Sequence, residues 1–160
     1  MKNNSGQTLI EVLAAFGVAV MLATAITIAV ISALSNATFS KNQNLATQYA
    51  QGGMEMIRKM RNDNFTTFDG LSGNYCLDKR CVGLTDSLPY CWTRGTGCGT
   101  NIDNVFVREV AIEKNSPSCA NAAKVTVATS WSDSKCTSSP FCHSVQLVSC
   151  FSNINAIPAP

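Results

Sequence analysis

The sequence has little of what marks enzymes, zinc sites and nucleic-acid-binding domains. His143 is its only histidine, no two cysteines form a C-x-x-C pair, and the formal net charge is only +2. Zinc sites normally combine two close ligand pairs, and nucleic-acid-binding domains carry a pronounced basic surface. A lone histidine without a cluster of serine, cysteine or carboxylate side chains offers no evident catalytic base. We therefore expect neither an enzyme nor a need for a metal or other cofactor.

Charge is also absent from a long stretch near the N-terminus, because residues 12–40 contain no charged side chain. Within that stretch Val12–Leu34 is an apolar run of 23 residues. A helix of this length rises about 1.5 Å per residue and spans a hydrocarbon core of about 30 Å, so the run can cross a membrane. Lys2 and the amino terminus would hold its N-terminal end in the cytoplasm. The few polar side chains in the run can bond carbonyls of their own helix; these are Thr24, Thr27 and Ser32.

The cysteines are confined to the second half of the chain. They are Cys76, Cys81, Cys91, Cys98, Cys119, Cys136, Cys142 and Cys150. An even number without close metal-ligand pairs favours disulfides, and hence an extracytoplasmic location for residues after about 40. His143 directly follows Cys142, and we do not expect both side chains to turn toward one metal. The sequence leaves the pairings open; we favour Cys136 with Cys142 first and Cys76 with Cys81 second.

The residues just before the apolar run form a recognisable motif. Gly6-Gln7-Thr8-Leu9-Ile10-Glu11, followed at once by the apolar helix, resembles the prepilin peptidase site of type IV pilins and type II secretion pseudopilins. The resemblance implies cleavage after Gly6 and methylation of the new amino terminus on Gln7. It also implies that Glu11, the fifth residue of the mature chain, neutralises the amino terminus of a neighbouring subunit. Gln7 replaces the phenylalanine usual in the family, and the run lacks the proline of many major pilins, so we predict no kink.

Two other interpretations of the N-terminal segment stay open: a removable secretory signal and a plain membrane anchor. Ala23-Thr24-Ala25 fits a signal cleavage pattern, but the apolar run exceeds the usual length of about 7–15 residues. Neither alternative needs Glu11, whose carboxylate costs about 2–3 kcal/mol if drawn toward the bilayer centre. An acid in that position usually has a partner, which favours the pilin leader.

The predicted helix continues beyond the membrane run. Apolar side chains recur at intervals of three, four or seven residues as far as Met60; they are Phe39, Ala46, Tyr49, Met56, Ile57 and Met60. Gly52-Gly53 weakens the helix by about 1 kcal/mol per glycine, and either close packing of a strand or flexibility would explain the pair. Asn62-Asp63-Asn64 indicates the end of the helix. We therefore predict one helix from about Gln7 to about Arg61.

Three segments rich in β-branched or alternating apolar residues predict strands: Val105–Glu113, Lys124–Trp131 and His143–Phe151. Their sequences resemble the sheet of V-type minor pilins and I-type pseudopilins. The expected fold class is α+β and pilin-like, with one long N-terminal helix packed on a small antiparallel sheet with disulfide-rich loops. The expected divisions are a cleaved leader (1–6), a transmembrane or filament-core half of the helix (7–34), an amphipathic half (35–62), a cysteine-rich loop region (63–104), the sheet (105–152) and a tail (153–160).

The favoured function is that of a minor subunit of a type IV pilus-like filament used in adhesion, motility or DNA uptake. Its expected partners are other pilin subunits, prepilin peptidase, a pilus or secretion assembly platform and the membrane. It would span the cytoplasmic membrane once before assembly and lie on the cell surface afterwards. The alternatives are a pseudopilin of a type II secretion system and a non-polymerising, membrane-anchored binding module rich in disulfides. Nucleic-acid binding remains a hypothesis that rests on Arg58, Lys59, Arg61, Lys79 and Arg80.

Overall fold

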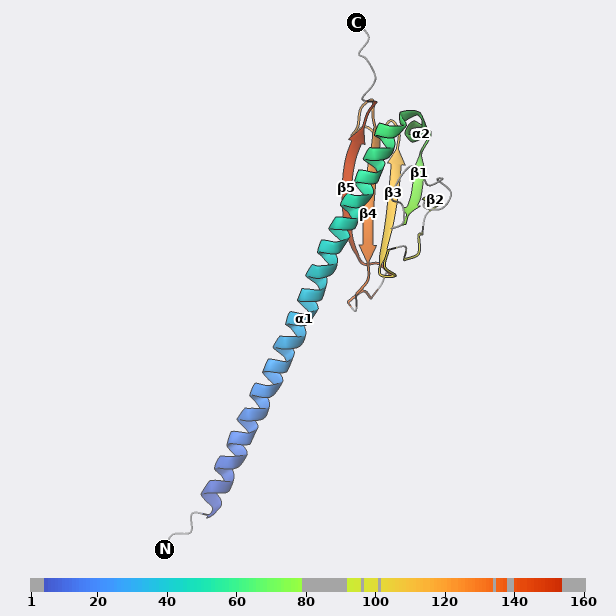
Figure 1. Ribbon diagram of the computed structural model, residues 1–160. Coiled ribbons are helices and arrows are strands. Elements are labelled where there is room, and N and C mark those ends of the chain that lie inside the picture. Colours follow the sequence, from blue (N-terminus) through green and yellow to red (C-terminus); the bar gives the residue numbers. More distant parts are fainter. Residues whose placement is uncertain are drawn as a thin grey trace. The chain divides into compact units, whose positions relative to one another are not determined.

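A single long helix opens the structure. The computed structural model describes residues 5–78, 92–95, 97–100, 102–133, 135–137 and 140–153. Helix α1 covers Ser5–Asp63 and the short helix α2 covers Phe65–Asp69 (Figure 1). The helix predicted from about Gln7 to about Arg61 is thus confirmed. Together with an antiparallel sheet and disulfides, α1 makes the predicted α+β, pilin-like arrangement.

The chain divides into two units, Met1–Lys41 and Asn42–Pro160. The described part of the first unit is helical throughout. The second unit contains the remainder of α1, all of α2 and the whole sheet. The hydrophobic core accordingly lies within the second unit.

The sheet has five antiparallel strands in the order β2-β1-β3-β4-β5. They are β1 (Gly73–Leu77), β2 (Trp92–Arg94), β3 (Phe106–Glu113), β4 (Ala123–Trp131) and β5 (His143–Phe151). Strands β3 to β5 confirm the three predicted segments to within one residue at each end. The prediction of a long loop over residues 63–104 is wrong where α2, β1 and β2 form. β1 is only five residues long and pairs with β3, which lies about thirty residues further along the chain, so local periodicity did not reveal it.

The central strand β4 shows why this sequence forms a one-sided sheet. Its residues alternate between buried and half-buried along all nine positions. Val125, Val127, Thr129 and Trp131 are buried, as the alternation predicted. Opposite them in the ladder, Val127 faces Val110 of β3 and Leu147 of β5. One apolar face is therefore continuous across the three strands.

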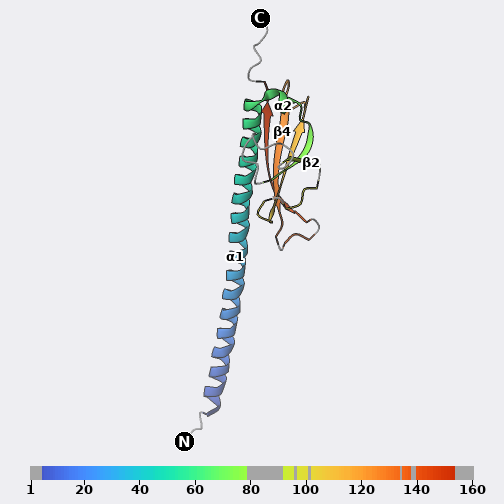
Figure 2. The same ribbon diagram turned by 45° about the vertical axis from the view of Figure 1, so that its right-hand side comes forward.

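The C-terminal part of α1 covers this face, and Figures 1 and 2 show it running along the sheet. The buried residues of the helix form one stripe of helical period: Ala46, Ala50, Met54, Ile57 and Met60. Tyr49 and Met56, which the sequence also assigned to this face, are half-buried at its borders. The predicted amphipathic helix is confirmed. The middle of its buried face lies at Ala50 and Met54, and the predicted Tyr49 and Met56 lie at its borders.

Gly53 lies at the closest approach of α1 to the sheet. A Cβ atom at this position would lie 3.0 Å from Val127 Cγ1 and 3.1 Å from Arg108 Cδ. At Gly52 the nearest atom would be Arg108 Nη1, at 3.8 Å, which is an ordinary contact. Strand packing thus explains Gly53 as the sequence suggested, but it does not explain Gly52.

The helix ends where the run Asn62-Asp63-Asn64 predicted. Asp63 is the last residue of α1, and Asn64 takes an extended conformation. The Asn64 side chain accepts a hydrogen bond of 3.0 Å from the backbone N–H of Thr67 and so caps α2. Phe68 of α2 is buried and packs on Phe151 of β5, which closes this end of the core.

The two adjacent glycines generate a matched pair of substitutions with opposite expected effects. Gly53→Ala should lower the free energy of unfolding of the second unit by about 1–3 kcal/mol, because Val127 and Arg108 are buried and have no room to move. Gly52→Ala should leave it unchanged or raise it by up to about 1 kcal/mol, since alanine favours the helix. Denaturant unfolding of the full chain in detergent, followed by near-UV circular dichroism, measures both. Equal effects of the two substitutions would contradict the close approach at Gly53.

Candidate functional site

The first half of α1 presents apolar side chains in every direction around the helix. Fourteen large apolar residues between Leu9 and Leu34 are exposed, the least exposed being Val20 at 47%. They are Leu9, Ile10, Val12, Leu13, Phe16, Val18, Val20, Met21, Leu22, Ile26, Ile28, Val30, Ile31 and Leu34. Among the described residues, α1 is the one helix that is long and apolar enough to cross a membrane. By length and composition it is therefore a candidate membrane span.

Burial of this apolar surface would contribute a large favourable free energy. Burying one such side chain stabilises a structure by about 1.5–3 kcal/mol, so the fourteen together correspond to about 20–40 kcal/mol. A whole domain is typically stable by only about 5–15 kcal/mol. Because these side chains are 47–74% exposed, burial would recover a part of that sum. Lipid or other apolar helices would supply such burial.

The polar groups inside the apolar stretch are satisfied by the helix itself. Thr24 Oγ1 donates a 2.8 Å hydrogen bond to the Met21 carbonyl, and Thr27 Oγ1 donates a 2.9 Å bond to the Ala23 carbonyl. The sequence-based expectation is confirmed for these two hydroxyls. They therefore place no obstacle to burial of the helix in lipid.

Glu11 is the only charged residue between Lys2 and Lys41. It lies in α1, exposed, between the apolar residues Ile10 and Val12. Residues 6 and 7, where cleavage and methylation are predicted, lie in the first turns of the same helix, and Met1–Asn4 lie outside the described residues. A carboxylate in such a setting is tolerated in an apolar environment only when an opposite charge or a proton neutralises it. Glu11 is consequently the one position on the apolar helix that can select a charged partner.

Among the described residues, three disulfides hold the loops of the second unit to the sheet. Cys76–Cys98 ties β1 to the segment after β2, Cys119–Cys150 ties the β3–β4 connection to β5, and Cys136–Cys142 closes the β4–β5 loop. The predicted pair Cys136–Cys142 is confirmed. The predicted pair Cys76–Cys81 is wrong, because Cys76 pairs with Cys98 across 22 residues of sequence rather than with its near neighbour.

Two of the predicted disulfide cysteines, Cys81 and Cys91, lie outside the described residues. No cysteine in the described part of the chain is free. This framework is what an exported domain with long loops requires.

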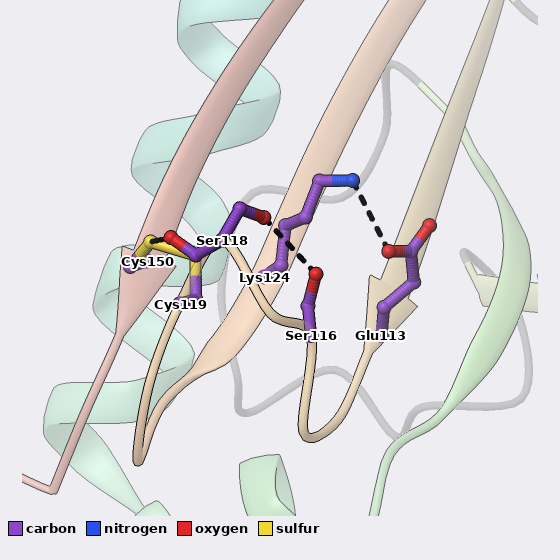
Figure 3. The surroundings of a disulfide bond; sticks show 6 residues. All are labelled: Glu113, Ser116, Ser118, Cys119, Lys124 and Cys150. Carbon is purple, nitrogen blue, oxygen red and sulfur yellow. Dashed lines mark hydrogen bonds and ion pairs between the residues drawn. A yellow bond between two sulfur atoms is a disulfide. The ribbon is translucent and has the colours of Figure 1, made fainter.

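The Cys119–Cys150 bond fixes the turn between β3 and β4 (Figure 3). In that turn the hydroxyls of Ser116 and Ser118 lie 3.0 Å apart in a hydrogen bond. Beside them Lys124 of β4 pairs with Glu113 of β3 at 3.1 Å, across adjacent strands. Cys119 is buried and Cys150 is exposed, so the bond joins the interior of the turn to the outer face of β5.

Arg108 is the most deeply buried charge in the second unit, at 3% exposure. Its Nε donates to the Leu77 carbonyl at 3.2 Å, its Nη1 to the Tyr49 carbonyl at 2.8 Å, and its Nη2 to the Asp78 carbonyl at 2.8 Å. Desolvation by burial lowers the pKa of Arg108 to about 10, against smaller raising effects of Asp78 and Tyr49. The guanidinium stays charged at neutral pH and links α1, the end of β1 and β3. No special role was predicted for this residue, since its position in an alternating strand looks like that of any exposed arginine.

Just after the C-terminal end of β4, Asp133 lies close to His143, the first residue of β5. His143 Nε2 is 3.1 Å from Asp133 Oδ2, and the His143 ring packs on Trp131 with centroids 5.4 Å apart. The backbone N–H of Lys135 bonds to Asp133 Oδ1 and lowers the pKa of that carboxyl most, and His143 lowers it further. This packing leaves His143 half-buried.

The loop between β4 and β5 differs from the expectation that the side chains of Cys142 and His143 would not turn toward one metal. The donor atoms of Asp133, Cys136, Cys142 and His143 all lie within 4.8 Å of one another. Cys142 and its neighbour His143 therefore both contribute to one cluster. Steric direction therefore does not separate them, although both cysteines are engaged in the disulfide.

The basic residues that suggested nucleic-acid binding are partly engaged in other contacts. Arg58 forms an ion pair with Glu55 one turn earlier in α1. Arg61 donates to the Asn62 side chain and its guanidinium lies 5.3 Å from the centre of the Phe151 ring. Lys79 and Arg80 lie outside the described residues. Lys59 is exposed on the same helix, so the hypothesis rests on fewer available cations than the sequence indicated.

No family model, curated protein or solved structure matches the chain.

The role of Arg108 can be tested by an uncharged residue of similar shape. Arg108→Met should lower the free energy of unfolding by about 2–4 kcal/mol, because it leaves one buried and two partly buried carbonyls with one fewer donor each. The measurement is denaturant unfolding of the full chain in detergent.

Arg94→Met is the matched control, because Arg94 is an exposed arginine on β2. A surface substitution of this kind usually changes stability by less than about 0.5 kcal/mol. Similar losses in the two variants would show that Arg108 does not link the helix to the sheet.

Proposed function

We propose that this protein is a minor subunit of a type IV pilus-like filament. It enters the cytoplasmic membrane as a single-pass protein with its N-terminus inside. Prepilin peptidase removes the leader after Gly6, and the subunit polymerises with other pilin subunits through the first half of α1. Its role is structural, with no catalytic step of its own.

The observation that carries the proposal is the combination of an all-round apolar helix with a single acid near its start. A helix that only anchors a domain needs the apolar residues but gains nothing from Glu11. A helix that leaves the membrane for a filament core needs both. The apolar surface passes from lipid to neighbouring helices, and the acid supplies a specific point of attachment.

The chemistry of that attachment follows from cleavage after Gly6. Cleavage creates a positive amino terminus at Gln7, and methylation of this primary amine gives a secondary amine that still carries the positive charge. An amine and a carboxylate buried in an apolar core are tolerable only as a pair. The amino terminus of one subunit opposite Glu11 of its neighbour satisfies both groups and sets the stagger between adjacent helices.

The second unit would then face outward and determine what the filament contacts. Its described loops are closed by disulfides, one of which, Cys136–Cys142, spans only six positions of sequence at an exposed loop. Such bonds protect loops at the cell surface, where no cellular reductant acts. This favours a pilus used in adhesion, motility or DNA uptake over a secretion pseudopilus, whose subunits stay within the envelope.

The decisive variant is Glu11→Gln, which keeps the shape of the side chain and removes its charge. We expect normal membrane insertion and normal cleavage, with surface filaments reduced more than tenfold, because breaking a buried ion pair costs about 3–5 kcal/mol. Shearing of cells followed by immunoblotting measures surface filaments, and the membrane fraction from the same cells measures insertion.

Glu55→Gln is the matched control, since Glu55 is an exposed carboxylate on the same helix whose ion pair with Arg58 is a surface contact of little energetic value. Its filaments should equal those of the unaltered chain. Filament levels unaffected by Glu11→Gln, or no sheared protein even from the unaltered chain, would favour a membrane-anchored binding module instead.

A further inference from the structure

A pocket opens at the end of the second unit where β3 and β5 finish. Helix α2 lies at the same end (Figure 1). The pocket has a volume of about 310 Å³, which is within the range of small-molecule sites. Three chain segments line it, namely α2, the turn between β3 and β4, and the end of β5; the residues include Phe65, Asp69, Lys114, Asn115, Asn121 and Ser152. All of them belong to the second unit, so the pocket does not involve the first half of α1.

Two asparagines of the β3–β4 turn give the pocket its neutral hydrogen-bonding groups. Asn115 and Asn121 both have a left-handed backbone, with φ of 56° and 58°, a conformation that asparagine tolerates better than most residues. Both are exposed, and within the described part of the chain neither side-chain amide takes part in a hydrogen bond. Each amide offers an NH₂ donor and a carbonyl acceptor. The turn therefore presents two groups that can both donate to and accept from a hydroxyl.

The charged side chains in the pocket lining neutralise each other. Lys114 Nζ lies 3.5 Å from Asp69 Oδ1 and also donates to the Asp69 backbone carbonyl. This pair joins the β3–β4 turn to α2, and no other charged residue lines the pocket among the described residues. A ligand with a net charge would have to compete with the existing pair. The lining thus favours an uncharged ligand that is rich in hydrogen-bonding groups.

An aromatic ring adds an apolar surface to this polar lining. Phe65 is half-buried, and its ring packs at a tilt on Phe68 with centroids 6.0 Å apart. Phe151 also lines the pocket, but it is buried and its ring already contacts Phe68 and the Arg61 guanidinium. The exposed part of Phe65 is consequently the aromatic surface available to a ligand. A ligand with both hydroxyls and an apolar face suits such a combination.

The wall that carries the asparagines is fixed before any ligand binds. The Cys119–Cys150 bond ties the β3–β4 turn to β5, two residues before Ser152 (Figure 3). Within the turn, the Cys119 N–H donates to the Ser116 carbonyl at 2.9 Å, and the Ala122 N–H donates to the Cys119 carbonyl at 3.2 Å. A rigid wall loses little conformational entropy on binding. The disulfide also persists outside the cell, where the second unit is expected to lie.

We propose that this pocket binds a neutral saccharide. In this interaction the amides of Asn115 and Asn121 bond the sugar hydroxyls, and the ring of Phe65 packs on the apolar C–H face of the sugar. An apolar ligand would displace water from the two amides and leave them without partners, which costs free energy. A sugar hydroxyl instead both donates and accepts, as each amide does. The inference concerns the second unit alone and stands whether or not the chain polymerises.

The test titrates the full chain with three neutral sugars, galactose, mannose and N-acetylglucosamine, in a detergent without a sugar head group. At least one of them should bind with a Kd of about 1 mM or lower. Nuclear magnetic resonance should show shifts of the side-chain amide signals of Asn115 and Asn121. The charged relatives glucuronate and glucosamine should bind at least about tenfold more weakly, because the paired charges in the lining offer them no counter-ion.

Glycine substitutions separate ligand binding from the role of asparagine in the turn. Glycine adopts a positive φ without strain. The double variant Asn115→Gly with Asn121→Gly should therefore keep the circular dichroism spectrum of the sheet and bind the sugar at least about tenfold more weakly. Asn104→Gly is the matched control, since Asn104 is also exposed, has φ of 54° and precedes β3 at its other end. Its affinity should equal that of the unaltered chain.

Phe65→Leu gives an independent readout, because leucine keeps an apolar side chain and removes the ring. It should weaken sugar binding by at least about threefold. The proposal is overturned if none of the three neutral sugars binds, or if the charged relatives bind as well as the neutral ones. Unchanged affinity in the double glycine variant or in Phe65→Leu would overturn it too, as would an equal loss in Asn104→Gly.

Discussion

The apolar surface of residues 9–34 is the constraint on which the rest of this structure depends. Residues 12–40 carry no charge, so this part of the helix has no charged side that would favour contact with water. A bilayer or a bundle of similar helices would bury its apolar side chains. Every other feature of the chain, from the acid at position 11 to the disulfides, is consistent with a helix that starts in one of these environments and carries an exported domain.

In the second unit, a small sheet packs on the C-terminal part of α1. The helix offers a narrow stripe of buried apolar residues, and Gly53 lets β3 and β4 approach closely. Arg108 then bonds the backbone of both α1 and the end of β1. Apolar contact supplies most of the free energy, and the buried guanidinium fixes the position of the helix on the sheet.

Much of this fold could be predicted from the sequence because its main signals are local. The helix follows from an apolar run and a 3.6-residue period, and β4 follows from strict alternation between Lys124 and Trp131. β1 could not be found in this way, because its few residues become a strand only through pairing with β3. The same limit explains the error at Cys76: the nearest cysteine in sequence was preferred, whereas the sheet brings Cys98 beside it.

The candidate sites also differ in whether the local sequence reveals them. Gly6, Gln7 and Glu11 stand together in a short motif, so the sequence reveals them without any tertiary structure. The cluster of Asp133 and His143 with two cysteines was missed, because adjacency of Cys142 and His143 suggested diverging side chains, whereas their donor atoms lie within 4.8 Å of each other. Arg108 was missed for a similar reason, since burial of a strand residue depends on which face the helix covers.

Mass spectrometry of the intact protein and its N-terminal peptide tests the central claim most directly. Material sheared from the cell surface should be compared with the membrane fraction, with and without reduction. The account predicts a sheared species that begins at Gln7, with or without a methyl group, and gains two hydrogens on reduction for each disulfide. A chain found only in membranes and still beginning at Met1, or one beginning near Ile26, would contradict it.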